Sequence, residues 1–167
     1  RKWGSSGSGD GQFNEPWGIT VDVVDANLTE VYVAEWNAHR IQVFDSNGAF
    51  RRKFGNSTLN SNPADVKIGP DGLVYVSSRG KTRIKVFQKD GTYLREFNPT
   101  YRPHAIDFLG NLLVVANGDN NRVKIFETNG TLVTTIGSGT ASSDAGQFDN
   151  NYGVAVSPSG DLHVACR

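Results

Sequence analysis

Residues 31–55 read VYVAEWNAHRIQVFDSNGAFRRKFG, and the middle of this stretch recurs twice along the chain. The segment RIQVF at 40–44 is matched by RIKVF at 83–87 and by RVKIF at 122–126. The last residues of these segments, Phe44, Phe87 and Phe126, stand 43 and 39 residues apart. A period of this size is typical of an array of supersecondary units, so the chain is predicted to be a repeat protein.

Each recurrence lies within a predicted unit of four short strands. Alternating apolar side chains such as Ile19 and Val21 indicate strands with one buried face. Asn-Gly and Asp-Gly pairs after the recurring segments supply the positive φ that tight hairpins need. We expect first strands at 19–22, 66–69, 105–108 and 153–157, second strands at 31–34, 74–77, 112–116 and 162–165, third strands at the recurring segments, and fourth strands at 49–54, 92–97 and 132–136.

Such units predict an all-β protein, a β-propeller of four-stranded antiparallel blades, because neighbouring sheets must cover each other's faces and a closed ring protects strand edges. About four blades are expected, at residues 14–55, 62–98, 102–137 and 150–167. The opening RKWG at 1–4 resembles RKFG at 52–55, so it is interpreted as the last strand of a preceding or shared blade. The glycine-rich segment 5–13 is interpreted as a linker, because its GDGQF is echoed by DAGQF at 144–148.

Bulk composition excludes several classes. The 17 basic residues balance the 17 acidic ones, so no global field attracts nucleic acid or an anionic membrane. No apolar run is long enough for a membrane span. A single cysteine, Cys166, forms no internal disulfide. Three sequons, at Asn27, Asn56 and Asn129, fall on predicted loops and are glycosylation candidates, but they do not decide the compartment.

The segments GSGDGQFNEPWGITVD (7–22), VYVAEWNAHRIQVFDSNGAF (31–50) and RRKFG (51–55) closely resemble NHL repeats, and the similarity extends over essentially the whole chain. The resemblance implies a propeller that usually has six blades. Members of the family bind RNA hairpins or protein partners, as in tripartite-motif proteins, hold a catalytic zinc ion in amidating lyases, or serve as extracellular modules. The implied compartment is cytoplasmic in the first class and extracellular if the sequons are used.

The zinc alternative can be tested on the sequence. The lyase pattern places histidines at the start of the first strand in several blades, so that they converge on the axis. His104 occupies that position, but its counterparts are Trp17, Ala64 and Tyr152. Neither a metal nor another cofactor is therefore expected, and the segment is predicted to be non-catalytic, with a lyase or lactonase as the alternative if metal ligands lie outside it.

A binding surface is the favoured prediction. Loops between second and third strands, and loops that lead into first strands, emerge on one face of a propeller. The candidates on that face are Trp17, Trp36, His39, Arg79, Lys81, Tyr101, Arg102, His104, Asn120 and Tyr152. Tryptophan, tyrosine and arginine are typical of protein hot spots, and cations among aromatic rings also suit RNA, so a protein partner is expected and RNA is the alternative.

Two alternatives to binding are retained. Trp17 and Tyr152 occupy equivalent positions and would also serve to close the mouth of the ring. The repeated residues Arg40, Arg83 and Arg122 are interpreted as structural, each fixing a loop to a neighbouring carboxylate or carbonyl. Further blades, or another copy of the chain, would complete the ring.

Overall fold

The repeated unit folds as a four-stranded antiparallel sheet in the computed structural model, which describes residues 2–25, 29–59 and 61–166. The first sheet contains β3 (Pro16–Val23), β4 (Thr29–Glu35), β5 (Arg40–Asp45) and β6 (Phe50–Gly55). The second contains β7 (Pro63–Ile68), β8 (Val74–Ser78), β9 (Arg83–Phe87) and β10 (Tyr93–Phe97). The third contains β11 (Ile106–Leu109), β12 (Leu112–Asn117), β13 (Arg122–Glu127) and β14 (Leu132–Ile136). Strands β15 (Gly153–Val156) and β16 (Leu162–Ala165) form a two-stranded sheet in the described part of the chain.

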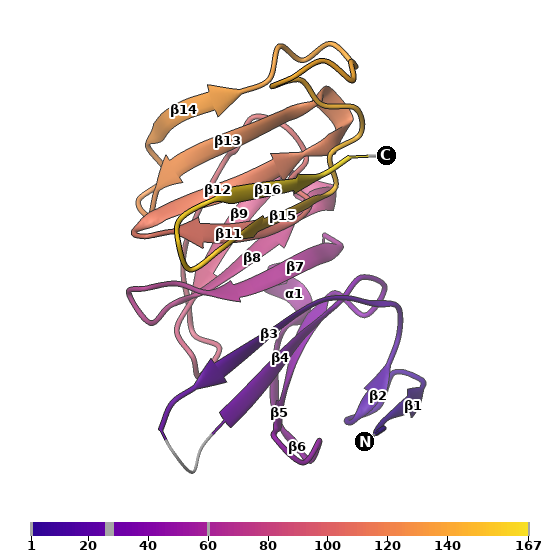
Figure 1. Cartoon of the computed structure of the whole chain (residues 1–167). Coiled ribbons are helices and arrows are strands. Elements are labelled where there is room, and N and C mark those ends of the chain that lie inside the picture. The colour runs from indigo at the N-terminus through magenta and orange to yellow at the C-terminus, as the bar shows by residue number, and fades with distance from the viewer. Residues whose placement is uncertain (1, 26–28, 60, 167) are drawn as a thin grey trace.

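The sheets follow one another around a common axis as the blades of a propeller (Figure 1). The first strands β3, β7, β11 and β15 contact one another in sequence, and each of the three four-stranded sheets then runs outward to its fourth strand. The predicted fold class is confirmed, and every predicted strand of the four units is present with boundaries shifted by a few residues at most.

Apolar side chains fill the spaces between successive blades. One buried cluster joins Tyr32 and Val43 of the first blade to Val66 of the second. A second cluster joins the second and third blades in the same way, and a third cluster joins the third blade to the β15–β16 sheet. Burying each aliphatic side chain contributes about 1.5–3 kcal/mol, so packing between sheets supplies the main stabilisation of the arc.

A contact that we call the blade joint occurs at the outer part of the interface between the first and second blades and again between the second and third. Phe54 of β6 packs on Phe87 of β9 with 5.2 Å between ring centroids, and Phe97 of β10 packs on Phe126 of β13 at 5.6 Å. The glycine of the hairpin turn between third and fourth strands lies against the same ring. A Cβ atom added at Gly91 would stand 2.5 Å from Phe54 Cβ.

The same contact exists before the first blade. Trp3 packs on Phe44 of β5 at 6.4 Å, and its indole lies against the turn glycine Gly48. Residues 2–4 form no strand, although RKWG was predicted to be a fourth strand, and Arg1 lies outside the described residues. The position of Trp3 matches that of Phe54 in the next joint, so the assignment of 1–4 to a preceding or shared blade stays a prediction.

Short elements between the blades were not predicted. Strands β1 (Ser5–Ser6) and β2 (Gln12–Phe13) pair in parallel within the glycine-rich linker. One turn of helix, α1 (Asn56–Leu59), connects the first and second blades, because Leu59 is fully buried in the cluster between them. The 3-10 turns η1 (Arg79–Lys81) and η2 (Gly118–Asn120) link second to third strands. Within the described residues, no helix has the length and apolar character to cross a membrane.

Candidate functional site

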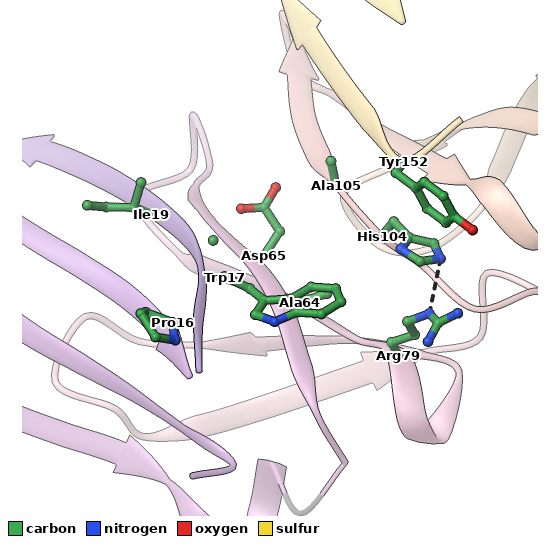
Figure 2. A pocket seen from close by; sticks show the side chains of 10 residues that line it. Pro16, Trp17, Ile19, Ala64, Asp65, Arg79, His104, Ala105 and Tyr152 are labelled. Atoms are coloured by element: carbon green, nitrogen blue, oxygen red, sulfur yellow. Dashed lines mark hydrogen bonds between the residues drawn. The ribbon is translucent and has the colours of Figure 1, made fainter. Parts of the chain in front are cut away.

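The residues that open the first strands converge at one end of the propeller axis. They line a pocket of about 670 Å³ between the first, second, third and fourth sheets (Figure 2). In the close-up, Trp17 reaches in from one side, and His104 and Tyr152 lie on the other. The complete lining consists of Pro16, Trp17, Gly18, Ile19, Ala64, Asp65, Arg79, His104, Ala105 and Tyr152.

Three aromatic rings, those of Trp17, His104 and Tyr152, line the pocket. Trp17 is 52% exposed and stacks on Trp36, with 4.2 Å between centroids and 18° between planes. Tyr152 is 42% exposed and meets His104 edge-on at 4.5 Å. The Arg79 guanidinium stands over Trp36 at 5.7 Å. The rings of Trp17 and Tyr152 therefore remain partly exposed to solvent, and each is held in place by contact with a second ring.

Arg79 is fixed by its neighbours. Its Nε donates a hydrogen bond to Nε2 of His104 at 3.0 Å, and its Nη2 donates to Oδ1 of Asp119 at 3.0 Å. Burial, and then the positive charge of Arg79, lower the pKa of His104, which suits an imidazole that accepts a hydrogen bond at Nε2. Burial alone would raise the pKa of Asp119, but the hydrogen bond and charge of Arg79 outweigh it and hold that pKa below its usual value. The Arg79 guanidinium therefore makes internal contacts, and these contacts fix the side chains of the pocket wall.

Asp65 is the carboxylate of the pocket. Its oxygens accept hydrogen bonds from the backbone N–H groups of Val66 and Ile106, both at 2.9 Å. Burial nevertheless raises the pKa of Asp65 to about 6. The β3 and β7 strands approach closely here, and a Cβ atom on Gly18 would stand 2.5 Å from Cα of Asp65. Glycine at position 18 therefore permits the two first strands to meet at the pocket floor.

The structure does not gather all ten predicted residues in the pocket. Trp17, Arg79, His104 and Tyr152 line it, and Trp36 supports it from behind. Arg102 lies at its margin, 59% exposed at its side chain, with Nη1 3.8 Å from Asp119 Oδ2. The other four candidates, described next, point elsewhere.

Internal contacts hold three of the four remaining candidates, and the fourth, Lys81, is exposed. His39 Nδ1 accepts a hydrogen bond from the backbone of Asn62 at 3.1 Å, so it fixes a loop. Tyr101 lies under the ammonium group of Lys124 at 5.2 Å. The Asn120 amide, oriented to satisfy both of its groups, accepts from Arg122 at 3.1 Å and donates to the Asn117 carbonyl. Lys81 is exposed and lines a separate cavity.

The repeated arginines make the kind of contacts that were expected of structural residues. Arg40 is buried and paired with Glu35 at 2.7 Å, and it donates to the carbonyls of Ser8, Gly9 and Gln12. Arg83 pairs with Glu96 at 3.1 Å. Arg122 donates to the carbonyl of Ser138 at 2.7 Å. The three side chains tie strands to the loops and strands beside them.

Sequence reasoning missed Asp65 and Asp119. Asp65 follows the first-strand position that also holds Trp17, His104 and Tyr152, and its counterparts are Gly18, Ala105 and Gly153. A carboxylate at a position where the other three units have glycine or alanine could have marked Asp65 as a candidate site residue. Asp119 lies opposite Arg79 on the next blade, and only the spatial arrangement of the loops shows that it pairs with this cation.

Among the residues that the structure describes, no group of three or more His, Cys, Asp or Glu side chains is placed to hold a metal ion. Of the sequons, Asn56 and Asn129 are exposed, and Asn27 lies outside the described residues. Cys166 is an exposed free thiol.

Comparison with known proteins gives matches of two kinds. A protein-family model described as "Lactonase, 7-bladed beta-propeller" matches residues 23–141. Protein brain tumor of Drosophila melanogaster is 32% identical over 147 residues, which are 81% of this chain and 14% of that protein. Protein lin-41 of Caenorhabditis elegans is 43% identical over 51 residues, 30% of this chain and 4% of that protein. Both relatives are NHL-repeat proteins, and the chain spans only a small part of each.

Solved propellers share the fold. A streptogramin B lyase structure superposes with a TM-score of 0.67 at 16% identity, covering 91% of this chain and 48% of that one. A selenomethionine-substituted virginiamycin B lyase from Staphylococcus aureus gives 0.64 at 18% identity, covering 92% and 64%. Identities this low show the architecture alone.

Proposed function

The chain belongs to the lactonase-type seven-bladed β-propeller family and is built of NHL repeats, and on that premise we propose that it is a non-catalytic recognition scaffold whose aromatic pocket binds a segment of a partner protein. The resemblance to NHL repeats predicted six blades, whereas the matched family model describes seven. NHL-type relatives support binding of protein or RNA in general. The choice of a protein partner rests on the pocket.

The observation that carries the proposal is the pair of exposed rings, Trp17 and Tyr152, on a wall of fixed side chains. Interface hot spots are enriched in tryptophan, tyrosine and arginine and lie in pockets that exclude water. Pro16, Ile19 and Ala64 add apolar lining to the pocket. An apolar or aromatic side chain of an extended peptide fits such a surface.

The test uses peptides selected from a display library on the intact chain, followed by measurement of Kd with variants. Trp17→Ala and Tyr152→Ala should each weaken binding about tenfold or more, since hot-spot truncations cost about 2 kcal/mol or more. Tyr93→Ala is the matched control, because Tyr93 is also 42% exposed but lies on the outer strand β10. Equal losses in Tyr93→Ala and Tyr152→Ala would reject the pocket as the binding site.

RNA binding is the second candidate, and it has a specific basis in two exposed cations, Lys81 and Arg102, on the loop-rich face. Arg79, another predicted residue of that face, already donates hydrogen bonds to His104 and Asp119. On this hypothesis Arg102→Ala weakens binding of an RNA hairpin and reduces the slope of its salt dependence by about one, while Arg79→Ala disturbs the pocket wall instead. A salt slope unchanged by Arg102→Ala would remove this candidate.

A lyase or lactonase activity is the third alternative, because the matched family and the solved propellers carry such names. It requires catalytic ligands outside the described residues. Metal analysis of the protein that contains this segment tests it, and a stoichiometric bound metal would favour the enzyme over the scaffold.

A further inference from the structure

A second cavity, of about 270 Å³, lies at the outer rim of the loop-rich face in the second blade. Its lining is entirely polar or charged: Ser57, Thr58, Lys81, Arg83, Lys85 and Glu96. Three cationic side chains face one carboxylate there, which gives a net formal charge of +2. The proposed peptide pocket shares none of these residues.

The first blade shows which groups surround an arginine at the position equivalent to Arg83. In the first blade the equivalent of Arg83 is Arg40, whose guanidinium donates to three linker carbonyls, those of Ser8, Gly9 and Gln12. The extended glycine-rich linker before that blade brings these oxygens within 3.1 Å. Arg40 is therefore surrounded by oxygen atoms: the Glu35 carboxylate neutralises its charge, and the three linker carbonyls accept its remaining hydrogen bonds.

The second blade lacks this supply of oxygen atoms. The linker before this blade folds into the single helical turn α1, which places Leu59 in the core, and within the described residues no linker carbonyl accepts a hydrogen bond from Arg83. Arg83 donates through Nε to Glu96 and through Nη1 to the Thr82 carbonyl, and within the described residues Nη2 donates no hydrogen bond. Lys81 makes no hydrogen bond or ion pair in the same part of the chain and is exposed.

Glu96 does not satisfy the site by itself. Its carboxylate is shared between Arg83 at 3.1 Å and Lys85 at 3.2 Å. Lys85 also donates to the Thr58 carbonyl at 2.5 Å. Within the described residues, the cavity is thus lined by the Nη2 group of Arg83 and the ammonium group of Lys81, neither of which has a hydrogen-bond partner, and by the hydroxyl side chains of Ser57 and Thr58.

We propose that this cavity, which we call the rim cavity, binds a dianionic phosphoryl group, whose oxygens take the places that linker carbonyls occupy around Arg40. A phosphoryl dianion matches the net charge, and its three terminal oxygens accept charge-assisted hydrogen bonds from arginine and lysine. Free phosphate and a phosphate monoester carried by a partner share this chemistry.

Titration of the intact, ¹⁵N-labelled chain at pH 8 and constant ionic strength tests the proposal, with inorganic phosphate, phosphoserine and dimethyl phosphate as probes. Phosphate and phosphoserine should give saturable shifts at the amides of Ser57, Thr58, Lys81 and Arg83. Dimethyl phosphate carries one charge and should bind about tenfold more weakly. Tighter binding of phosphoserine than of phosphate would assign the group to a phosphorylated partner, and equal binding would assign it to free phosphate.

Two variants act in opposite directions, which separates binding from a change in folding. Lys81→Ala removes an exposed cation and should weaken phosphate binding about threefold or more, whereas Glu96→Gln removes the competing carboxylate and should tighten it by a similar factor. Arg51→Gln is the control, because Arg51 pairs with Asp45 at the far end of the first blade. The proposal is overturned by shifts that do not saturate, by equal binding of dimethyl phosphate, or by a Glu96→Gln variant that binds no tighter.

Discussion

The blade joint makes a quantitative prediction about Gly91. Its φ of +96° already disfavours any residue with a Cβ atom, and that atom would stand 2.5 Å from Phe54 Cβ in the preceding blade. Gly72, in the first turn of the same blade, has a φ of +75°, and a Cβ atom added there would meet nothing within 4 Å. Alanine at position 72 therefore suffers backbone strain alone, whereas alanine at position 91 also presses on the joint.

The two costs can be separated. Left-handed backbone costs an L-residue about 1–2 kcal/mol, so Gly72→Ala should lose about that much free energy of unfolding. Overpacking adds about 1–3 kcal/mol, so Gly91→Ala should lose about 2–5 kcal/mol in total. For a chain of this size each kcal/mol lowers Tm by roughly 2–4 °C, which places the two variants several degrees apart.

Urea unfolding followed by tryptophan fluorescence and by far-UV circular dichroism measures both variants. Coincident curves by the two probes are needed before free energies are compared, because repeat arrays can unfold in stages. Gly130→Ala is a replicate, since Gly130 has a φ of +98° and lies against Phe97 in the next joint. If Gly91→Ala and Gly130→Ala cost no more than Gly72→Ala, the aromatic–glycine contact does not stabilise the blade interface.

Three further predictions concern buried polar groups. Glu35→Gln should lower the free energy of unfolding by about 3 kcal/mol or more, because it leaves the buried Arg40 guanidinium without its charged partner. Chemical denaturation measures this loss. Asp45→Asn is the control, because it removes the charge of a more exposed ion pair and should cost under about 1 kcal/mol. The pKa of Asp65 is raised to about 6, so the folded state binds a proton more tightly than the unfolded state. The free energy of unfolding of the unchanged protein, relative to that of Asp65→Asn, should therefore fall as pH rises from about 4 to about 6. A difference between the two proteins that stays constant with pH would refute the assignment. The pKa of His104 is lowered, so its contribution to stability is complete above its unfolded pKa, about 6.5, and should be lost as pH falls below it; NMR titration of the imidazole, with His163 as an exposed comparison, checks the direction.

The fold could be predicted because its signals are local and repeated. The RIQVF-type segments, the Asn-Gly and Asp-Gly turns and the alternation of apolar residues each fix a strand or hairpin, and three copies reinforce the register. The turn α1 was missed since four residues carry no helical periodicity, and it exists because Leu59 has a place in the core between blades.

Repeat positions in the sequence predict some of the pocket residues but not the contacts between them. Trp17, His104 and Tyr152 were placed together by counting repeat positions, and the close-up shows them around one cavity (Figure 2). What repeat position alone does not give is the distance between loops of different blades. Arg79 and Asp119 are 40 residues apart in the sequence, and their ion pair makes Arg79, a predicted binding residue, part of the pocket wall.

The blade joint has a consequence for how such chains change in length. The first and second units each offer an aromatic ring, Phe54 or Phe97, to the unit after them, and the second and third units each offer a glycine turn, Gly91 or Gly130, to the unit before them, so the second unit carries both halves of the connection. A gene segment copied in phase would insert a blade whose two sides already fit its neighbours. Rings with different numbers of blades can then arise by duplication without the invention of a new interface.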